Sequence, residues 1–346
     1  MWRCSNDNYI KADKCFLPLA WMLGTNNGIS AFIHPEGVFN DPGGEKLRVS
    51  TYPKLKKHFR FSNAFKLFPD VHTSREFGLN IYCNNESSSF EQIVNLYTAK
   101  TIDQCYESDR VLPVYMRTKE GKRNTQGCRS RILVIGKNQL IIFANIVEGN
   151  NHWKSTRLMN LYVNSLMGVL EKFYRIEEKL GDLKDIFPSQ MWNETNAQDD
   201  NLIERRTHFG NPHETILSGA HIGLFNPLFN CSNEDCKGNN DNTSVDLLSI
   251  NNNYIQRTNF VPCCNKRIYY EMSPTTFWGT KYIDYYRLVA RRRIDIEGER
   301  TLIPTLIPPE VAHTNGIIGF AFKSNRKLAL TLGCLGSIPY DFYIKV

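Results

Sequence analysis

The chain has 346 residues and a mass of 40.0 kDa, a length that favours two domains or more. It is 41% hydrophobic and 22% charged, which is typical of a globular protein and excludes the disordered and fibrous classes. Its 42 Lys and Arg residues outnumber 35 Asp and Glu, and the resulting net charge of +7 permits a polyanionic partner without requiring one.

The sequence also limits where the protein acts. No stretch approaches the roughly 18 consecutive apolar residues of a membrane-spanning helix, which excludes a membrane protein. Residues 1–7 contain no apolar segment of the kind that a secretory signal needs. We therefore expect a cytoplasmic protein with no membrane partner.

The first 90 residues predict the element order of an α/β protein. Residues 29–33 form a short apolar run, typical of a buried parallel strand, and Pro53 is expected to kink or restart the helix that contains it. The predicted elements are a helix, a strand, a helix and two strands, over 14–23, 29–33, 45–59, 61–68 and 77–82.

Two further elements are predicted before the middle of the chain. Residues 132–135 and 140–146 are rich in β-branched side chains and flank a turn, which indicates a hairpin. Apolar residues at helical spacing then predict a long helix over 156–180, with Ser155 as its N-cap and Gly181 just beyond its end.

The second half of the chain predicts a loop-rich α+β region. Residues 188–214 are polar and should form a loop. Short strand-like runs follow at 216–217, 221–225 and 245–250, between clusters of Asn, Gly and Pro.

Four of the ten cysteines raise the question of a zinc site. They are Cys231, Cys236, Cys263 and Cys264. Zinc ligands usually come in pairs with two to four intervening residues, and adjacent cysteines rarely both point at one metal. We therefore expect plain reduced thiols and no metal, and we keep zinc as the weaker alternative.

The chain lacks the common catalytic motifs. It has no glycine-rich turn after a first strand, no phosphate-binding loop, no zinc-protease motif and no nucleophile elbow. Its eight His residues form no close pair of the kind that binds a metal. The sequence therefore predicts no catalytic residue and no cofactor-binding residue in this chain.

Basic and aromatic residues alternate near the C-terminus. A helix over 283–294 would place Arg287 and Arg291 on one face, where they can contact phosphates beside neighbouring tyrosines. The alternative is a solvated salt-bridge face, neutralised by Asp284, Asp295, Glu297 and Glu299, and charge alone does not decide between the two. The candidate DNA-binding residues are Lys281, Arg287, Arg291, Arg292, Arg293 and Arg300, together with Ser218, His221 and Arg257 in nearby loops.

Several stretches, in order along nearly the whole chain, resemble one family. That family is the large restriction-modification DNA adenine-N6 methylases of the type IIG kind, which also occur in phage-defence systems. The matching stretches are 31–38 (AFIHPEGV), 41–44 (DPGG), 52–59 (YPKLKKHF), 66–72 (KLFPDVH), 79–82 (LNIY), 217–222 (LSGAHI), 226–227 (NP), 257–262 (RTNFVP), 284–287 (DYYR), 299–303 (ERTLI), 307–309 (IPP) and 312–313 (AH).

The departures from the family are equally informative. Such methylases carry a glycine-rich S-adenosylmethionine turn and an Asn-Pro-Pro-Tyr type tetrapeptide that holds the flipped adenine. Both are missing here. Residues 226–229 (NPLF) resemble the tetrapeptide superficially, but they lack the second proline and lie too far downstream. The resemblance thus implies that S-adenosylmethionine serves the complete family enzyme, and that this chain alone is inactive.

The resemblance also implies a domain layout. Residues 1–150 would be the back half of a Rossmann-like methyltransferase sheet with an insertion, 151–185 a long connecting helix, and 186–346 an incomplete α+β region for DNA target recognition. We expect a fragment or split subunit that binds double-stranded DNA and needs a separate chain carrying the cofactor-binding half. The alternative is a catalytically inert DNA-binding or interaction remnant.

Overall fold

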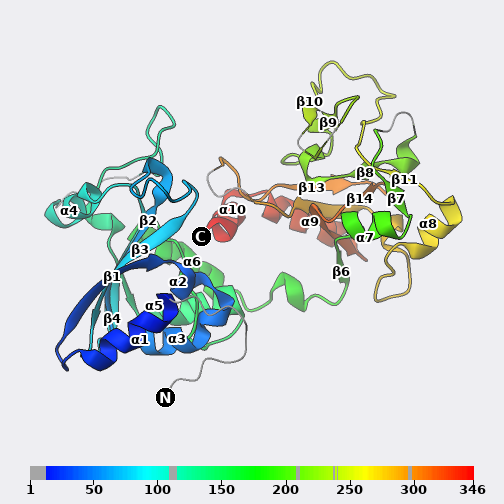
Figure 1. Ribbon diagram of the computed structural model, residues 1–346. Helices are drawn as coiled ribbons and strands as arrows, with labels where there is room; N and C mark the ends of the chain where they lie inside the picture. The colour runs from blue at the N-terminus through cyan, green and yellow to red at the C-terminus, as the bar shows by residue number, and fades with distance from the viewer. Residues whose placement is uncertain (1–12, 109–114, 208–210, 237, 240, 295–297) are drawn as a thin grey trace. The chain divides into compact units, whose positions relative to one another are not determined.

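The computed structural model describes residues 13–108, 115–207, 211–236, 238–239, 241–294 and 298–346. The chain divides into two compact units, residues 1–177 and 178–346, which we call unit 1 and unit 2 (Figure 1). The division falls within the segment 151–185 that we expected to connect two regions. Both units are mixed α/β structures. Within the described residues, no helix combines the length and the apolar character that crossing a membrane requires.

Unit 1 is built on one mixed sheet of five strands, in the order β1-β3-β2-β4-β5 (Figure 1). The β2–β4 pair is parallel and the other three pairs are antiparallel. The strands are β1 (Ile29–Pro35), β2 (Leu55–Ser62), β3 (Glu76–Cys83), β4 (Ser89–Leu96) and β5 (Leu133–Gly136). The α-helices are α1 (Asp13–Leu23), α2 (Gly37–Asn40), α3 (Glu45–Thr51), α4 (Lys100–Glu107), α5 (Lys137–Phe143) and α6 (Met167–Tyr174).

The start of unit 1 follows the predictions only in part. Helix α1 and strand β3 lie where the sequence predicted them. Helix α3 ends at Thr51, two residues before Pro53, because proline cannot continue a helix hydrogen-bond ladder, and the chain then enters β2. The predicted strand over 61–68 is therefore displaced to β2. Strand β1 is an edge strand antiparallel to β3 and not a buried parallel strand.

The two faces of this sheet differ in character. On one face Phe59 and Phe61 of β2 pack with Ile93 of β4 and Cys105 of α4 in an apolar core. The opposite face carries buried polar side chains from four neighbouring strands. They are His34, Asn80, Tyr82, His58, Arg60 and Gln92.

Glu36 joins this polar face from the turn after β1. Its carboxylate oxygens lie 3.1 and 3.2 Å from Nε2 of His58, and one lies 3.9 Å from Nε of Arg60. Gly78 leaves room for it, since a Cβ at that position would collide with Glu36 Oε1. We call Glu36, His58 and Arg60 the buried ionic cluster of unit 1.

Two predictions in the middle of the chain are wrong. The expected hairpin is strand β5 followed directly by helix α5, which buries Leu140 and Phe143 on one face. The expected long helix over 156–180 is helical only in α6 and in short 3₁₀ turns. Residues 156–162 form no helix or strand and are mostly buried. Leu158 donates its backbone N–H to the carbonyl of Phe39 at 3.1 Å. Burial on several sides produced the apolar spacing that resembled a helix.

Unit 2 contains a four-stranded antiparallel sheet in the order β13-β12-β15-β6 and three two-stranded sheets. Its strands are β6 (Ile186–Ser189), β7 (Ile203–Glu204), β8 (Ile216–Leu217), β9 (Asn230–Ser232), β10 (Asn242–Ser244), β11 (Val261–Pro262), β12 (Arg287–Arg291), β13 (Pro304–Ile307), β14 (Ala312–His313) and β15 (Ile317–Phe322). Its α-helices are α7 (Glu194–Asp199), α8 (Lys266–Met272), α9 (Asn325–Leu335) and α10 (Ile338–Lys345).

Strand β12 lies at the centre of unit 2 and corrects the predicted helix over 283–294. Leu288 packs with Phe322 and helix α9 on one face, while Val289 packs with Leu217 on the other. Because successive side chains alternate between two covered faces, Leu288, Val289 and Ala290 are all buried and show no strand-like alternation. Of the short strands predicted in this half, β8 is confirmed, whereas 221–225 and 245–250 form turns and irregular structure.

Candidate functional site

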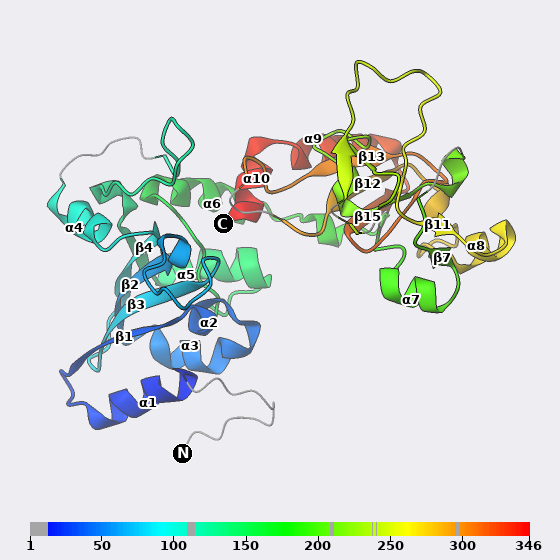
Figure 2. The same cartoon turned by 45° about the horizontal axis from the view of Figure 1, so that its top comes forward.

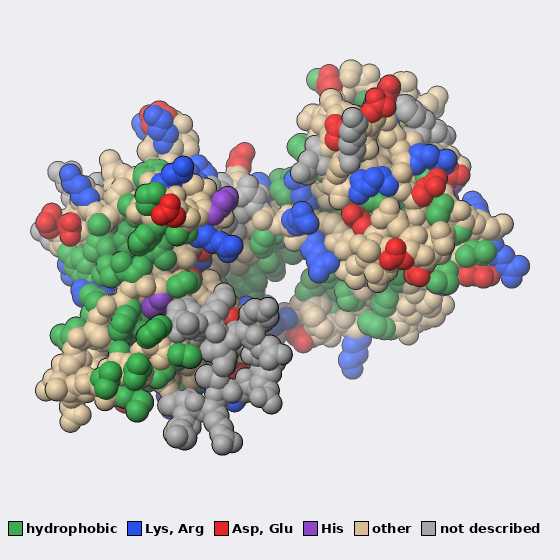
Figure 3. All heavy atoms as spheres, viewed as in Figure 1, with side chains coloured by type: hydrophobic (Ala, Val, Ile, Leu, Met, Phe, Trp, Pro, Cys, Tyr) green, Lys and Arg blue, Asp and Glu red, His purple; other side chains and the backbone are tan. Residues whose placement is uncertain are grey.

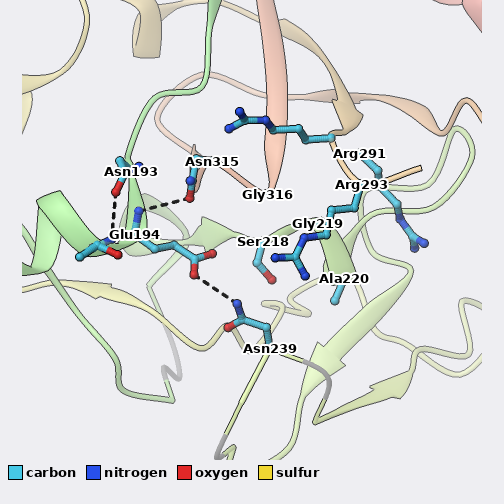
Figure 4. A pocket seen from close by; sticks show the side chains of 12 residues that line it. Asn193, Glu194, Ser218, Gly219, Ala220, Asn239, Arg291, Arg293, Asn315 and Gly316 are labelled. Atoms are coloured by element: carbon cyan, nitrogen blue, oxygen red, sulfur yellow. Dashed lines mark hydrogen bonds between the residues drawn. The ribbon is translucent and has the colours of Figure 1, made fainter. Parts of the chain in front are cut away.

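A pocket of about 630 Å³ opens on unit 2 where five chain segments meet (Figure 4). The segments are the start of α7, the turn after β8, Asn239, the end of β12 and the turn before β15. The lining residues are Asn193, Glu194, Thr195, Ser218, Gly219, Ala220, Asn239, Arg291, Arg292, Arg293, Asn315 and Gly316. We call this the arginine pocket.

Close backbone packing forms the floor of the arginine pocket. A Cβ on Gly219 would lie 2.8 Å from the carbonyl oxygen of Gly316, so only glycine lets these two turns approach. The carbonyl of Gly316 in turn accepts the backbone N–H of Arg292 at 3.0 Å. The turn that carries Ser218 is thereby fixed beside the end of β12.

The asparagines of the pocket hold backbone and side chains in place. The Oδ1 atom of Asn193 caps α7 by accepting the N–H groups of Thr195 and Asn196, each at 3.1 Å. The Oδ1 atom of Asn315 accepts the N–H of Glu194 at 3.2 Å. The first turn of α7 is therefore held at both its cap and its first residue.

Glu194 places a carboxylate in this otherwise basic pocket. The hydroxyl of Thr314 donates to its Oε1 at 2.9 Å, and Nδ2 of Asn239 donates to its Oε2 at 3.2 Å. Figure 4 shows Glu194, Ser218 and Asn239 directed toward the same space. Among the described residues, no Lys or Arg forms an ion pair with Glu194. Its remaining lone pairs can accept a hydrogen bond from a ligand.

The three consecutive arginines have different roles. Nε of Arg291 donates to the carbonyl of Ile222 at 2.8 Å, its guanidinium lies over the ring of Phe229, and burial lowers its pKa. Arg292 is exposed and donates to Gln190 at 3.0 Å. Arg293 is exposed and has no hydrogen-bond or ion-pair partner within the described part of the chain. Arg291 therefore supports the pocket, while Arg292 and Arg293 can donate to a ligand.

Three of the predicted DNA-binding residues are buried. They are Arg287, His221 and Ser218, of which Ser218 still lines the arginine pocket. Arg287 is fully buried and donates to the carbonyls of Tyr285, Pro308 and Val311. Burial lowers its pKa to about 10. The predicted helix face shared by Arg287 and Arg291 does not exist, because the segment is a strand. Arg287 is also buried in the interior of unit 2.

His221 is the second buried candidate. Its Nδ1 accepts the backbone N–H of Ser218 at 2.9 Å, so Nε2 carries the proton and donates to the hydroxyl of Ser232 at 2.9 Å. Burial lowers the pKa of His221 to about 4, which keeps the imidazole neutral. His221 thus positions Ser218 at the pocket and does not face a ligand itself.

Three other predicted residues lie outside the arginine pocket. Lys281 donates to the carbonyls of Glu271 and Ser273 at the end of α8. Arg300 pairs with Asp341 at 3.5 Å. Arg257 donates to the carbonyl of Ser232 and pairs with Glu234 at 3.2 Å.

The described residues do not form the solvated salt-bridge face of the alternative prediction. Asp284 accepts the hydroxyl of Tyr270 at 2.8 Å, and no ion pair joins it or Glu299 to the three pocket arginines in the described chain. Asp295 and Glu297 lie outside the described residues.

The four cysteines of the zinc alternative have separate surroundings. Cys236 donates to the carbonyl of Gly238, and Cys264 lies 3.8 Å from the carbonyl of Leu202. Across the described residues, no three His, Cys, Asp or Glu side chains group as metal ligands. The structure therefore gives the zinc alternative no support.

Sequence reasoning missed the acidic and amide part of the pocket. The sequence predicted only a polar loop for the segment that holds Asn193 and Glu194, and it assigned no role to Asn239 or Asn315. The one local signal was the order Asn193-Glu194, an N-cap residue followed by an acidic first turn.

Comparison with known proteins adds little to this geometry. A scan against models of protein families finds no match, and a search of curated proteins finds none either. Among solved structures, the chain is similar to the type IIG restriction endonuclease BpuSI, with 10% sequence identity and a TM-score of 0.32. The similarity covers 97% of this chain and 39% of that endonuclease, so the chain spans well under half of its length.

Proposed function

We propose that unit 2 binds double-stranded DNA through the arginine pocket, as the target-recognition part of a restriction-modification DNA adenine-N6 methylase. The observation that carries DNA binding is the pocket itself, where the exposed guanidinium groups of Arg292 and Arg293 meet amide and carboxylate groups. The methylase part of the proposal rests on the sequence resemblance.

The chemistry of the lining favours contact with base edges as well as phosphates. Arginine pairs with the O6 and N7 atoms of guanine, asparagine pairs with adenine, and a carboxylate accepts the amino group of cytosine. Glu194 would repel a phosphate, so its carboxylate does not fit a surface that contacts phosphates alone. Arg293 and Glu194 together supply one strong donor and one strong acceptor at the same opening.

Unit 1 supports the methylase part in a more limited way. Strands β1 and β2 both run antiparallel to β3, so they share a direction, and helices α2 and α3 connect them. Antiparallel β3 lies between them, so this pair shares only the helical crossover with the parallel units from which α/β sheets are built. The outer edge of β1 is open within this sheet and can pair with a further strand. In our proposal, the S-adenosylmethionine turn and the catalytic tetrapeptide come from a polypeptide outside these 346 residues.

The test is DNA binding by the whole chain and by the double variant Arg292→Ala, Arg293→Ala. We expect the variant to bind a random-sequence 30-bp duplex at least about tenfold more weakly, because it lacks two guanidinium groups that can contact phosphates. Fluorescence anisotropy measures this directly. The matched control removes two exposed arginines elsewhere in unit 2, Arg267→Ala and Arg326→Ala, and should bind like the wild type. Equal losses in both variants would contradict a role for the pocket.

A further inference from the structure

Unit 1 carries a projecting hairpin that the proposed function does not use. Arg117 and Arg123 face each other as an antiparallel bridge. At the tip the N–H of Thr118 donates to the carbonyl of Lys122 at 2.8 Å, and the N–H of Gly121 donates back to Thr118 at 2.9 Å. Gly121 has a φ of 76°, a conformation that glycine adopts without strain. We call residues 115–124 the basic hairpin.

The base of the basic hairpin is anchored to the body of unit 1. Buried Asn124 donates its N–H to the carbonyl of Met116 at 3.1 Å and its Nδ2 to the carbonyl of Tyr115 at 2.8 Å. The hydroxyl of Tyr162 also donates to Tyr115. The guanidinium of Arg123 lies over the ring of Tyr97. The tip thus extends from a fixed base, as Figures 1 and 2 show between α4 and the strands.

Positive charge is concentrated at this tip. The seven residues 117–123 contain four Lys or Arg and one Glu. The side chains of Lys119 and Lys122 are exposed and form no hydrogen bond or ion pair with other residues of the described chain. The nearby Thr118 side chain lowers the pKa of the Glu120 carboxyl, which keeps Glu120 charged. Figure 3 shows basic side chains beside an acidic one at the end of the projection.

We propose that the basic hairpin is a second DNA-contacting element, which places Lys119 and Lys122 against the phosphates of a duplex. A two-stranded ribbon is narrow enough to enter the major groove, and a local excess of three positive charges is complementary to a phosphate backbone. The inference goes beyond the proposed function, which assigns DNA binding to unit 2 alone. It rests on that function for the identity of the ligand.

The experiment measures binding of the full chain to a random-sequence 30-bp duplex at several salt concentrations. Changing Lys119→Ala and Lys122→Ala together should reduce the salt slope of log K by about 1.8, since each phosphate contact contributes roughly 0.9. The charge-preserving pair Lys119→Arg, Lys122→Arg should keep the wild-type slope. Because these side chains are exposed, the melting temperature should not change.

The control is a pair of exposed lysines elsewhere in unit 1, Lys46→Ala and Lys172→Ala, which should leave the slope unchanged. Wild-type binding with an unaltered slope in the Lys119, Lys122 variant overturns the hairpin proposal alone. Absence of salt-dependent duplex binding by the wild-type chain overturns this proposal and the proposed function together.

Discussion

At the level of single residues, the arginine pocket depends on side chains that cannot be exchanged freely. Arg291 and His221 hold the pocket through backbone carbonyls and N–H groups, and only Arg292 and Arg293 have exposed guanidinium groups there. Of three consecutive arginines, Arg291 thus supports the pocket, while Arg292 and Arg293 are available to contact a ligand. The division follows from burial, which sequence alone does not show.

Gly219 provides a test at this scale. Alanine there would bring its Cβ within 2.8 Å of the Gly316 carbonyl, a backbone atom that cannot rotate away. We expect Gly219→Ala to lower the free energy of unfolding of unit 2 by about 1–3 kcal/mol and to weaken duplex binding. The control is Gly168→Ala in α6, where an added Cβ has no atom within 4 Å. This substitution should raise the free energy of unfolding by about 0.5–1 kcal/mol. Thermal melting and anisotropy measure both effects, and an unaltered Gly219→Ala protein would refute the packing argument.

At the scale of elements, the sheet of unit 1 carries charge on a face that most sheets keep apolar. Burial alone would raise the pKa of Glu36, but the charges and hydrogen bond of His58, with Arg60, outweigh burial and lower it. A lowered folded-state pKa stabilises the fold above the unfolded-state value of 4.5, and this stabilisation is lost as the pH falls through the folded-state pKa. Strands β1 and β2 are thereby linked through a carboxylate whose charge depends on pH.

The corresponding variant is Glu36→Gln. Near pH 7 it should lower the free energy of unfolding by about 3–5 kcal/mol, because it breaks a buried ionic cluster. The difference from the wild type should shrink as the pH falls below about 4.5, where the unfolded chain binds the proton. Chemical denaturation at a series of pH values measures this. Glu86→Gln, in an exposed turn, is the control and should follow the wild-type curve at every pH.

The elements that the sequence predicted are those defined by local signals. Helix α1 and strand β3 have a clear period or a clear alternation, and Pro53 marks the end of α3. The conformation of residues 156–162 could not be predicted, because their backbone groups bind residues far away in the chain. These are the carbonyl of Phe39 and the side chain of Gln92. The arginine run was visible in the sequence, but its position at the end of a central strand was not. Glu194, Asn239 and Asn315 share no local pattern that could link them.

At the scale of the whole molecule, two units of different architecture each carry a candidate DNA-contacting surface. The pocket of unit 2 combines donors and an acceptor suited to base edges, and the basic hairpin of unit 1 offers charge alone. In our account, unit 2 supplies base readout as well as phosphate contacts from Arg292 and Arg293, and the basic hairpin adds phosphate contacts alone.

Our proposal also implies that this chain alone lacks the cofactor site. A glycine-rich turn lets a backbone approach S-adenosylmethionine closely, and the sequence contains no such turn after a strand. We expect no saturable binding of S-adenosylmethionine by the purified chain in isothermal calorimetry. A dissociation constant in the micromolar range would contradict the proposal that another polypeptide supplies the cofactor half.

The central claim is that Arg292 and Arg293 contact duplex DNA, and the salt dependence of binding tests it most directly. Binding of the wild type and of the Arg292→Ala, Arg293→Ala variant is measured on one duplex from about 50 to 200 mM salt. Our account predicts that the variant loses about 1.8 from the magnitude of the slope of log K against log salt. Parallel lines for the two proteins would contradict it.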